Sequence, residues 1–176
     1  MEERKVNVLI KLRGYRLSKK EETDGRTSYL VRTRRNNQRA LIWCIPEEGT
    51  VGIAVVKELQ KTMEDKGVER GIIVTSGKYT HAAKLQAKKS KIELLPRTFP
   101  SFDIFQHKLV PKHEILTSEE KGQILSQYRV KPFQLPQIKA SDPAVKAIGA
   151  RPGDILRIIR ESPTAGIHLA YRYVVQ

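Results

Sequence analysis

The sequence predicts an α/β protein made of two small domains: a mixed sheet with helices on its faces in residues 1–98, and a smaller α+β unit in residues 99–176. Three observations carry this prediction. Strand-like and helical apolar patterns alternate along the first part of the chain. A connector with two prolines and three phenylalanines follows in residues 97–113, and shorter elements come after it. The 176 residues are enough for two modest hydrophobic cores.

The start of the first part has an apolar pattern that suits more than one element. The apolar residues of 4–17 fit either a short helix or a first strand, ended by Gly14, and periodicity does not choose between the two. Residues 18–26 are charged and turn-like, which predicts a loop.

A β hairpin is predicted next. Residues 28–35 and 39–45 are rich in β-branched and aromatic side chains, and the turn-forming Asn36 and Asn37 lie between them. The first arm alternates charged with apolar residues and the second does not, so we expect the second arm to be the more central strand.

Two helices and two strands are predicted to follow the hairpin. Apolar residues in 50–66 recur at helical spacing, and Gly67 is well placed to end that helix. Residues 70–76 form a β-branched run typical of a buried strand, and Thr80 is placed to cap a second helix. The last strand of this part is expected in residues 91–96.

Helix signals dominate the second part of the chain. Residues 117–120 form a capping box that opens a helix running to about Tyr128. Asp followed by Pro at 142–143 predicts the start of another helix, and Gly149 is placed to close it.

Two strands joined by a turn from Ser162 to Gly166 are predicted at the end of the chain. In the last strand, alternate apolar residues share one face, which we expect to be buried; they are Ile167, Leu169, Tyr171, Tyr173 and Val175. His168 falls on the opposite, polar face.

Charge favours a polyanionic or strongly acidic partner. The net charge is +14, and splitting the chain after Thr98 gives 22 basic and 12 acidic residues before (net +10) and 11 and 7 after (net +4). The first part is therefore the better candidate for contact with nucleic acid. The alternative is a charge-rich surface typical of some thermophiles.

Cysteine content and hydropathy indicate the compartment. The one cysteine, Cys44, excludes an internal disulfide and a cysteine-rich zinc module, which fits a reducing compartment. No long uncharged apolar run and no signal peptide pattern is present, so we expect a soluble, unexported protein with no membrane partner.

Three stretches of the second part carry a family resemblance: HKLVPKHEILTSEEK, QLPQIKASDPAVKAIGARPGDILRIIRESPTAG and AYRYVV. They resemble the assembly domain of an archaeal RNA polymerase subunit, the counterpart of the shared fifth subunit of the eukaryotic nuclear polymerases, and RPGD and SPTAG look closer to the archaeal form. The resemblance implies a non-catalytic subunit of DNA-directed RNA polymerase, a nucleotidyltransferase complex whose polymerisation chemistry and Mg²⁺ belong to other subunits. We expect it in the cytoplasm of an archaeon, or in the nucleus if the source is eukaryotic.

Four stretches of the first part carry a second resemblance: ALIWC, VGIAVVKELQ, GIIVTSGKYTHAAKLQA and KIELLP. Through them the first part is similar to the Mrr-type endonuclease domain, and to the jaw domain of restriction-endonuclease-like fold found in the eukaryotic subunit. The resemblance implies a jaw lying near downstream duplex DNA.

Nuclease chemistry is not expected in this jaw. A nuclease of this fold needs an acidic residue on the hairpin and an (E/Q)-x-K pair on the next strand, which together hold Mg²⁺ and place the attacking water. In the Mrr pattern the pair falls at Trp43 and Ile45, and neither side chain binds a metal. The jaw is therefore expected to be catalytically dead, with no catalytic residue, metal or cofactor. His107 and His113 lack a nearby cysteine and are expected to be structural.

Docking on the largest polymerase subunit is implied for residues of the resembling motifs, several of which are equally suited to fixing turns and helix ends. They are Leu109, Val110, Pro111, His113, Leu135, Pro136, Ile138, Asp142, Pro143, Arg160 and Tyr171.

Contact with DNA is predicted at the start of the second helix. Lys78 is expected in a loop, with Thr80, His81 and Lys84 at a helix start whose free N–H groups favour a phosphate. The contact is expected to be independent of sequence. The competing interpretation is a capped surface helix with solvated lysines. The sequence leaves three environments open for four further arginines: DNA, a neighbouring subunit, or solvent alone. They are Arg32, Arg34, Arg35 and Arg39.

Two other functions remain open from the sequence. One is a nuclease-derived DNA-binding protein that carries a polymerase-docking tail, which predicts metal-dependent cleavage or binding to free duplex. The other is an assembly module whose jaw is only a basic spacer. Charge reversal of Lys78 and Lys84 separates the spacer from a DNA-contacting jaw, because a spacer leaves the salt dependence unchanged.

Overall fold

The computed structural model describes residues 2–176 except 24, 34–36, 47–48 and 163–165. The chain divides into two compact units, Met1–Phe102 and Asp103–Gln176. Phe99, which the sequence pattern predicts in the second part, packs in the core of the first unit. Each unit is described by itself below.

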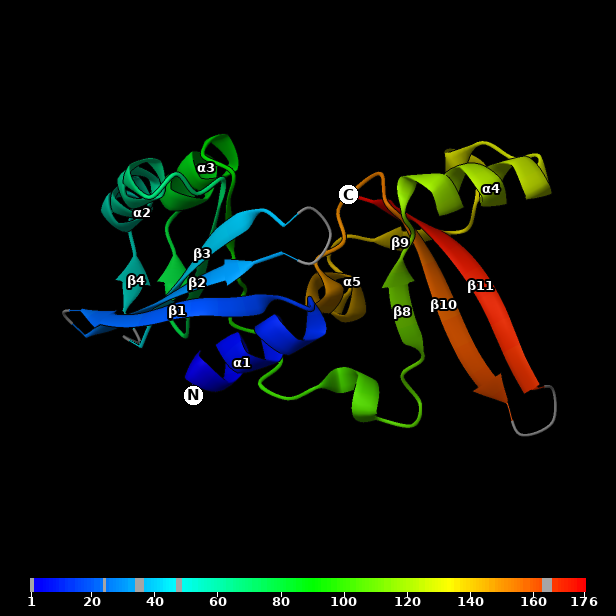
Figure 1. Ribbon diagram of the computed structural model, residues 1–176, viewed down its shortest axis with the longest axis horizontal. Helices are drawn as coiled ribbons and strands as arrows, with labels where there is room; N and C mark the ends of the chain where they lie inside the picture. Colours follow the sequence, from blue (N-terminus) through cyan, green and yellow to red (C-terminus); the bar gives the residue numbers. More distant parts are fainter. Residues whose placement is uncertain (1, 24, 34–36, 47–48, 163–165) are drawn as a thin grey trace. The chain divides into compact units, whose positions relative to one another are not determined.

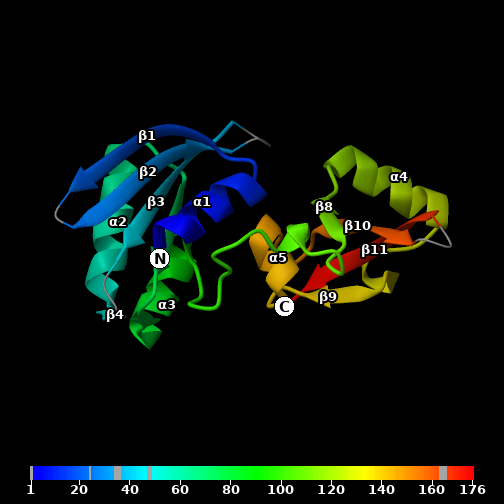
Figure 2. The same ribbon diagram turned by 90° about the horizontal axis from the view of Figure 1, so that it is seen from below.

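The first unit is a five-stranded mixed sheet with helices on both faces, which confirms the predicted α/β class (Figures 1 and 2). The strand order is β1-β2-β3-β5-β7, antiparallel from β1 to β3 and parallel from β3 to β7. The strands are β1 (Arg16–Thr23), β2 (Arg26–Arg32), β3 (Arg39–Ile45), β5 (Arg70–Thr75) and β7 (Ile92–Leu94). A two-stranded parallel sheet joins β4 (Thr50–Val51) to β6 (Lys78–Tyr79).

Two apolar cores lie on the two faces of this sheet. Helix α1 (Glu2–Leu12) contributes Val6 and Leu9 to one core. Helices α2 (Ile53–Asp65) and α3 (His81–Lys89) contribute to the other core, which contains Leu41 and Trp43 of β3. Successive residues of β3 enter opposite cores, as the period of two along a strand requires, and all of Ala40–Ile45 is buried.

The predicted hairpin is confirmed, with β3 between β2 and β5 as the more central strand. Of its turn, Asn37 has a left-handed backbone with φ 51°, while Asn36 lies outside the described residues. Gly67 follows α2 with φ 59°, and Thr80 caps α3, its Oγ1 accepting a hydrogen bond from the N–H of Ala83. The structure thus confirms the predicted ends of both helices.

The loop predicted for residues 18–26 is wrong. Residues 18–23 belong to β1, which pairs with β2 along the edge of the sheet. An edge strand that is exposed on both sides needs no alternation of apolar and polar residues. The charged composition of β1 therefore gives no strand pattern in the sequence. The ambiguity of residues 4–17 resolves into α1, a turn at Gly14 with φ 61°, and the start of β1.

The second unit is a four-stranded sheet with the order β8-β10-β11-β9 (Figure 1). Its strands are β8 (Lys112–Ile115), β9 (Gln137–Lys139), β10 (Ile155–Ser162) and β11 (Gly166–Val175). Helices accompany the sheet in the described part of this unit; they are α4 (Ser118–Tyr128), α5 (Pro143–Ile148) and the 3₁₀ helices η1 (Ile104–Gln106) and η2 (Pro132–Gln134).

Both predicted helices of this unit are confirmed, together with their caps. Thr117 and Glu120 form the capping box of α4. The carboxylate of Asp142 accepts the N–H groups of Ala144 and Val145 at the start of α5, and Gly149 ends that helix with φ 73°. Strands β10 and β11 form the predicted pair, while residues 163–165 of the turn lie outside the described residues.

The burial expected for the final strand is only partly correct. Tyr171 and Tyr173 pack against the core formed around Leu116, Leu135 and Ile155. Ile167 and Leu169, at the other end of β11, are 71% and 46% exposed. The β10–β11 hairpin extends beyond the two strands beside it. Strand β8 pairs with β10 only as far as Ile159, and β9 pairs only with residues 173–175 of β11.

A candidate docking groove and a candidate DNA-facing loop

A groove of about 550 Å³ in the second unit gathers most of the predicted docking residues. Among the residues lining it are eight of the eleven: Leu109, Val110, Pro111, His113, Ile138, Asp142, Pro143 and Arg160. They come from the segment before β8, from β8 itself, and from β9, α5 and β10, so the sheet brings together residues that lie far apart in the sequence.

Strand register decides which side chains face this groove. His113 pairs directly with Ile158, and both line the groove. Because side chains alternate along a strand, Arg160 lies on the same face as Ile158. On β11, Arg172 joins them and donates a hydrogen bond of 3.1 Å to the carbonyl oxygen of Gln137.

Hydrogen bonds fix the polar groups of the groove. The Nδ1 atom of His113 lies 2.8 Å from the carbonyl oxygen of Pro111. A carbonyl only accepts, so Nδ1 carries the hydrogen. The His113 ring also lies beside that of Phe105, with centroids 5.8 Å apart. Asp142 is held by the N–H groups at the start of α5.

The groove combines an apolar floor with charged groups. Val110, Pro111, Ile138 and Ile158 provide the apolar part, and Leu109 projects with 82% of its surface exposed. Arg160 is exposed, and within the described part of the chain no ion pair involves it. Such a surface suits a protein segment that inserts an apolar side chain between charged neighbours.

Three predicted docking residues lie outside the groove. Leu135 is only 9% exposed and belongs to the core. The carbonyl of Pro136 accepts the N–H of Tyr173. Tyr171 lies on the other face of the hairpin, with its ring 6.0 Å from that of Tyr128. All three residues therefore have contacts within the unit that do not require a partner protein.

Four lining residues were missed by sequence reasoning: Ile104, Ala144, Ile158 and Arg172. The alternation of β10 is a usable signal for Ile158, since it lies two residues before Arg160. No comparable signal marks Ile104, which sits in a 3₁₀ helix. Also, His113 lies on strand β8 rather than on an irregular connector as expected.

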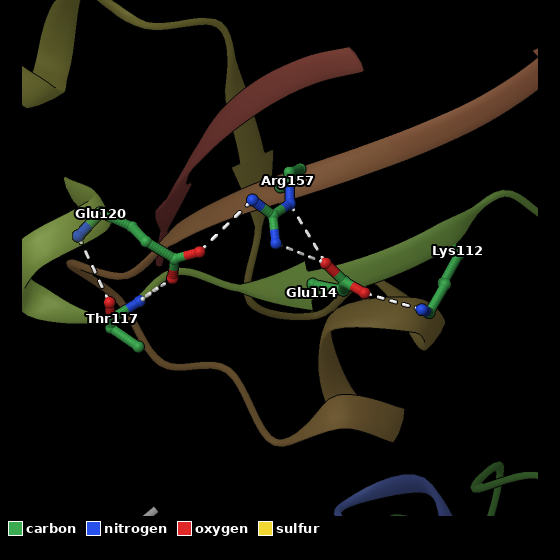
Figure 3. A network of polar contacts seen from close by, with 5 residues as sticks. All are labelled: Lys112, Glu114, Thr117, Glu120 and Arg157. Atoms are coloured by element: carbon green, nitrogen blue, oxygen red, sulfur yellow. Dashed lines mark hydrogen bonds and ion pairs between the residues drawn. The ribbon is translucent and has the colours of Figure 1, made fainter. Parts of the chain in front are cut away.

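A polar network on the opposite face of the sheet holds β8, β10 and α4 together (Figure 3). Arg157 of β10 donates to Glu114, its directly opposed residue on β8, at 2.8 Å and to Glu120 of α4 at 3.3 Å. Hydrogen bonds from Lys112 and Arg157 lower the pKa of the Glu114 carboxyl. The network therefore fixes the strands whose other face lines the groove.

In the first unit, the predicted DNA-contact residues lie around the start of α3. Lys78, His81 and Lys84 are exposed, and Thr80 caps the helix. Lys78 lies in the short strand β6 rather than in a loop as predicted, and its N–H donates to the carbonyl of Gly49. Both interpretations of the sequence, a phosphate contact and a capped surface helix with solvated lysines, fit this geometry.

Tyr79 and Gly77 position this segment. The hydroxyl of Tyr79 donates toward the carbonyls of Ile73 and Leu95, and burial raises its pKa. A Cβ on Gly77 would lie 1.8 Å from the carbonyl oxygen of Gly49, so the close approach of the two backbones requires glycine.

The positions that correspond to nuclease residues lie in the core. Trp43 and Ile45 are 8% and 5% exposed, and the guanidinium of Arg26 lies 5.5 Å from the Trp43 ring centroid. Cys44 between them is buried, which raises the pKa of its thiol to about 11. Over the described ranges of the chain, no three His, Cys, Asp or Glu residues cluster as metal ligands.

No helix in the described ranges combines the length and the apolar character needed to cross a bilayer.

Comparison with known proteins identifies both units. Residues 102–174 match the family model described as RNA polymerase Rpb5, C-terminal domain. Residues 3–98 match the model described as restriction endonuclease. A unit of the Rpb5 C-terminal type after an endonuclease-type α/β unit defines a class of RNA polymerase subunit.

The individual relatives are subunits of DNA-directed RNA polymerases. DNA-directed RNA polymerase subunit Rpo5 of Pyrococcus abyssi is 64% identical over 75 residues, which cover 43% of this chain and 92% of that protein. Rpo5 of Thermococcus celer is 58% identical over 79 residues, covering 45% and 96%. Subunit RPABC1 of DNA-directed RNA polymerases I, II and III of Caenorhabditis elegans is 37% identical over 134 residues, covering 74% and 64%.

The chain belongs to the Rpo5 family of DNA-directed RNA polymerase subunits, with an N-terminal unit of the restriction endonuclease family. Its partners are therefore other subunits of that polymerase. The match to RPABC1 is longer than the second unit, so it extends into the first.

Proposed function

We propose that the second unit docks on the largest subunit of the polymerase through the groove, and that the first unit lies near downstream duplex DNA without catalysing a reaction. The observation that carries the docking proposal is the convergence on one groove of eight residues that were predicted from two separate stretches of the sequence. Residues that serve only turns and helix ends have no reason to line a common surface.

The chemistry of the groove specifies what it accepts. Arg160 and Arg172 favour a carboxylate on the partner, whereas Asp142 favours a basic group. The exposed Leu109 and the apolar floor accept an aliphatic or aromatic side chain. Ile167 and Leu169 at the end of the hairpin add exposed apolar surface on the other face.

Docking is tested with the tagged full chain and the purified largest subunit. Leu109→Asp and Arg160→Glu are expected to weaken binding at least about tenfold, because each places an unpaired charge against the partner. Gln123→Glu on the exposed part of α4 is the matched control. Equal affinity of the wild type and all three variants would place the docking surface elsewhere.

Absence of nuclease activity is supported by the burial of Trp43 and Ile45, since an apolar core strand has no group that binds Mg²⁺. The match to the restriction endonuclease model favours the rival function, a nuclease-derived DNA-binding protein with a docking tail. Incubation of the full chain with supercoiled DNA and Mg²⁺ or Mn²⁺ separates the two, and we expect no cleavage.

Proximity to DNA is supported by the exposed cations at the start of α3 and by the hydrogen bonds that hold their segment in place. Lys78→Glu combined with Lys84→Glu is expected to weaken the dependence of the transcribing complex on salt, because fewer counterions are released when fewer phosphates are contacted. An unchanged salt dependence would leave the first unit as a basic spacer.

A further inference from the structure

Three arginines stand in one row across neighbouring strands of the first unit. Arg16 of β1 is paired directly with Arg32 of β2, and Arg32 is paired directly with Arg39 of β3. Directly opposed residues point to the same side of a sheet. Here it is the side that α2 covers further along, since Leu41 belongs to the core beneath α2 and Leu30 packs against that core. All three arginines are exposed. We call this row the arginine row.

Within the unit alone, this arrangement is unfavourable. Like charges placed directly opposite each other on adjacent strands destabilise a sheet. Over the described ranges, no carboxylate forms an ion pair with Arg16, Arg32 or Arg39. Other cations on this face are paired: Lys19 and Lys66 with Glu21, and Arg26 with Glu58.

We propose that the arginine row binds the phosphate backbone of duplex DNA. Strands lie 4.7–4.9 Å apart, so the row spans about 10 Å, and the same length of duplex axis carries roughly six phosphate charges. Guanidinium groups bind phosphate oxygens in a bidentate manner. The negative charge of the backbone removes the repulsion that the isolated sheet carries.

Duplex DNA fits this row better than an acidic protein segment does. Protein interfaces bind through a buried apolar or aromatic anchor, and the apolar neighbours on this face, Leu30 and Leu41, are already packed in the core of the unit. A phosphate backbone needs no such anchor, because it is bound by charge and hydrogen bonds.

The arginine row is separate from the surface at the start of α3, so the proposal goes beyond that contact. Arg39 is the first residue of β3, whereas the Lys78 segment bonds to Gly49, beyond the other end of the strand. Seven residues of β strand place the two surfaces about 20 Å apart. Variants of each surface are therefore independent.

The test measures binding of the full chain to a fluorescent duplex of about 25 base pairs and arbitrary sequence as salt is varied. In the row variant, Arg16, Arg32 and Arg39 become Gln. In the control variant, the exposed Arg4, Lys57 and Lys139 become Gln, which changes net charge equally. We expect the slope of log affinity against log salt to fall by up to about 3 in the row variant, and by less than about 1 in the control.

The melting temperature gives a second readout. The row variant should melt no lower than the wild type, because the substitutions remove repulsion between opposed arginines. Three results would overturn the proposal: an unchanged salt slope, an equal fall in both variants, or competition by poly-glutamate as effective as competition by unlabelled duplex. A fall in the Lys78, Lys84 double variant alone would support the α3 contact and contradict the arginine row.

Discussion

Gly77 illustrates how one backbone position sets the geometry of the segment that carries Lys78. Alanine there would bring its Cβ to 1.8 Å from the Gly49 carbonyl oxygen, so the two backbone segments must separate. We expect Gly77→Ala to destabilise the first unit by roughly 1–3 kcal/mol. Urea unfolding followed by the fluorescence of Trp43, the only tryptophan, reports on this unit.

Gly52→Ser is the matched control for Gly77, because nothing lies within 4 Å of a Cβ at Gly52 and the residue precedes α2 as its N-cap. Serine favours that position, so the midpoint of unfolding should stay or rise slightly. A stable Gly77→Ala variant would show that the β4–β6 contact is looser than described.

Glu114 is expected to make the second unit sensitive to acid. Its pKa is lowered by the hydrogen bonds from Lys112 and Arg157. Since the folded pKa is below the unfolded value of about 4.3, the stabilisation is complete above that pH and is lost as pH falls through the folded pKa. We expect Glu114→Gln to lower stability at pH 7 and to flatten the loss between about pH 5 and pH 3.

The measurement for Glu114 is urea unfolding by circular dichroism at several pH values, with the exposed Glu119→Gln as control. The control should keep the acid dependence of the wild type. Parallel curves for Glu114→Gln and the wild type would mean that the ion pair of Figure 3 makes no pH-dependent contribution.

At the scale of elements, Asp142 has two roles that substitution separates. It caps α5 through the N–H groups of Ala144 and Val145, and it lines the groove. Asn retains the cap and removes the charge, whereas Ala removes both. We expect Asp142→Ala to cost about 1 kcal/mol of stability and Asp142→Asn to cost little, while both weaken docking.

Thermal unfolding and binding to the largest subunit together check this prediction. If Asp142→Asn binds as tightly as the wild type, the carboxylate acts only as a helix cap. The groove would then owe its affinity to its apolar floor and to Arg160.

Elements with local end signals were predictable from sequence, and elements defined by pairing were not. The caps Thr80, Thr117 and Asp142 and the closing Gly149 each act within a few residues, so the helices followed from them. Strands β1, β4, β6, β8 and β9 were missed because they are charged or only two to four residues long, and only a neighbouring strand makes them strands.

In the candidate sites, too, local sequence motifs were predictable and contacts made by strand pairing were not. Residues of the family motifs converge on the groove, yet Leu135 and Tyr171 occupy motif positions and serve the core. Of the arginine row, Arg32 and Arg39 were singled out from the sequence, whereas Arg16 was not, because it is remote in sequence from the other two. Only the register of β1 on β2 brings it beside them.

For the whole molecule, two units with different chemistry serve one polymerase subunit. The first carries most of the excess positive charge, with net +10 up to Thr98 against +4 after it, and we propose that it faces DNA. The second carries the groove with mixed charge and an apolar floor, which we propose faces protein. Loss of docking should therefore remove the first unit from the transcribing complex, whereas loss of its cations should leave assembly intact.

The most direct measurement replaces Leu109 in the full chain with a photo-reactive phenylalanine derivative and assembles the variant with the remaining polymerase subunits. We predict that irradiation cross-links position 109 to the largest subunit, while the same group at Gln123 of α4 gives no such product. Cross-linking from position 123 and not from 109, in a complex that assembles normally, would contradict docking through the groove.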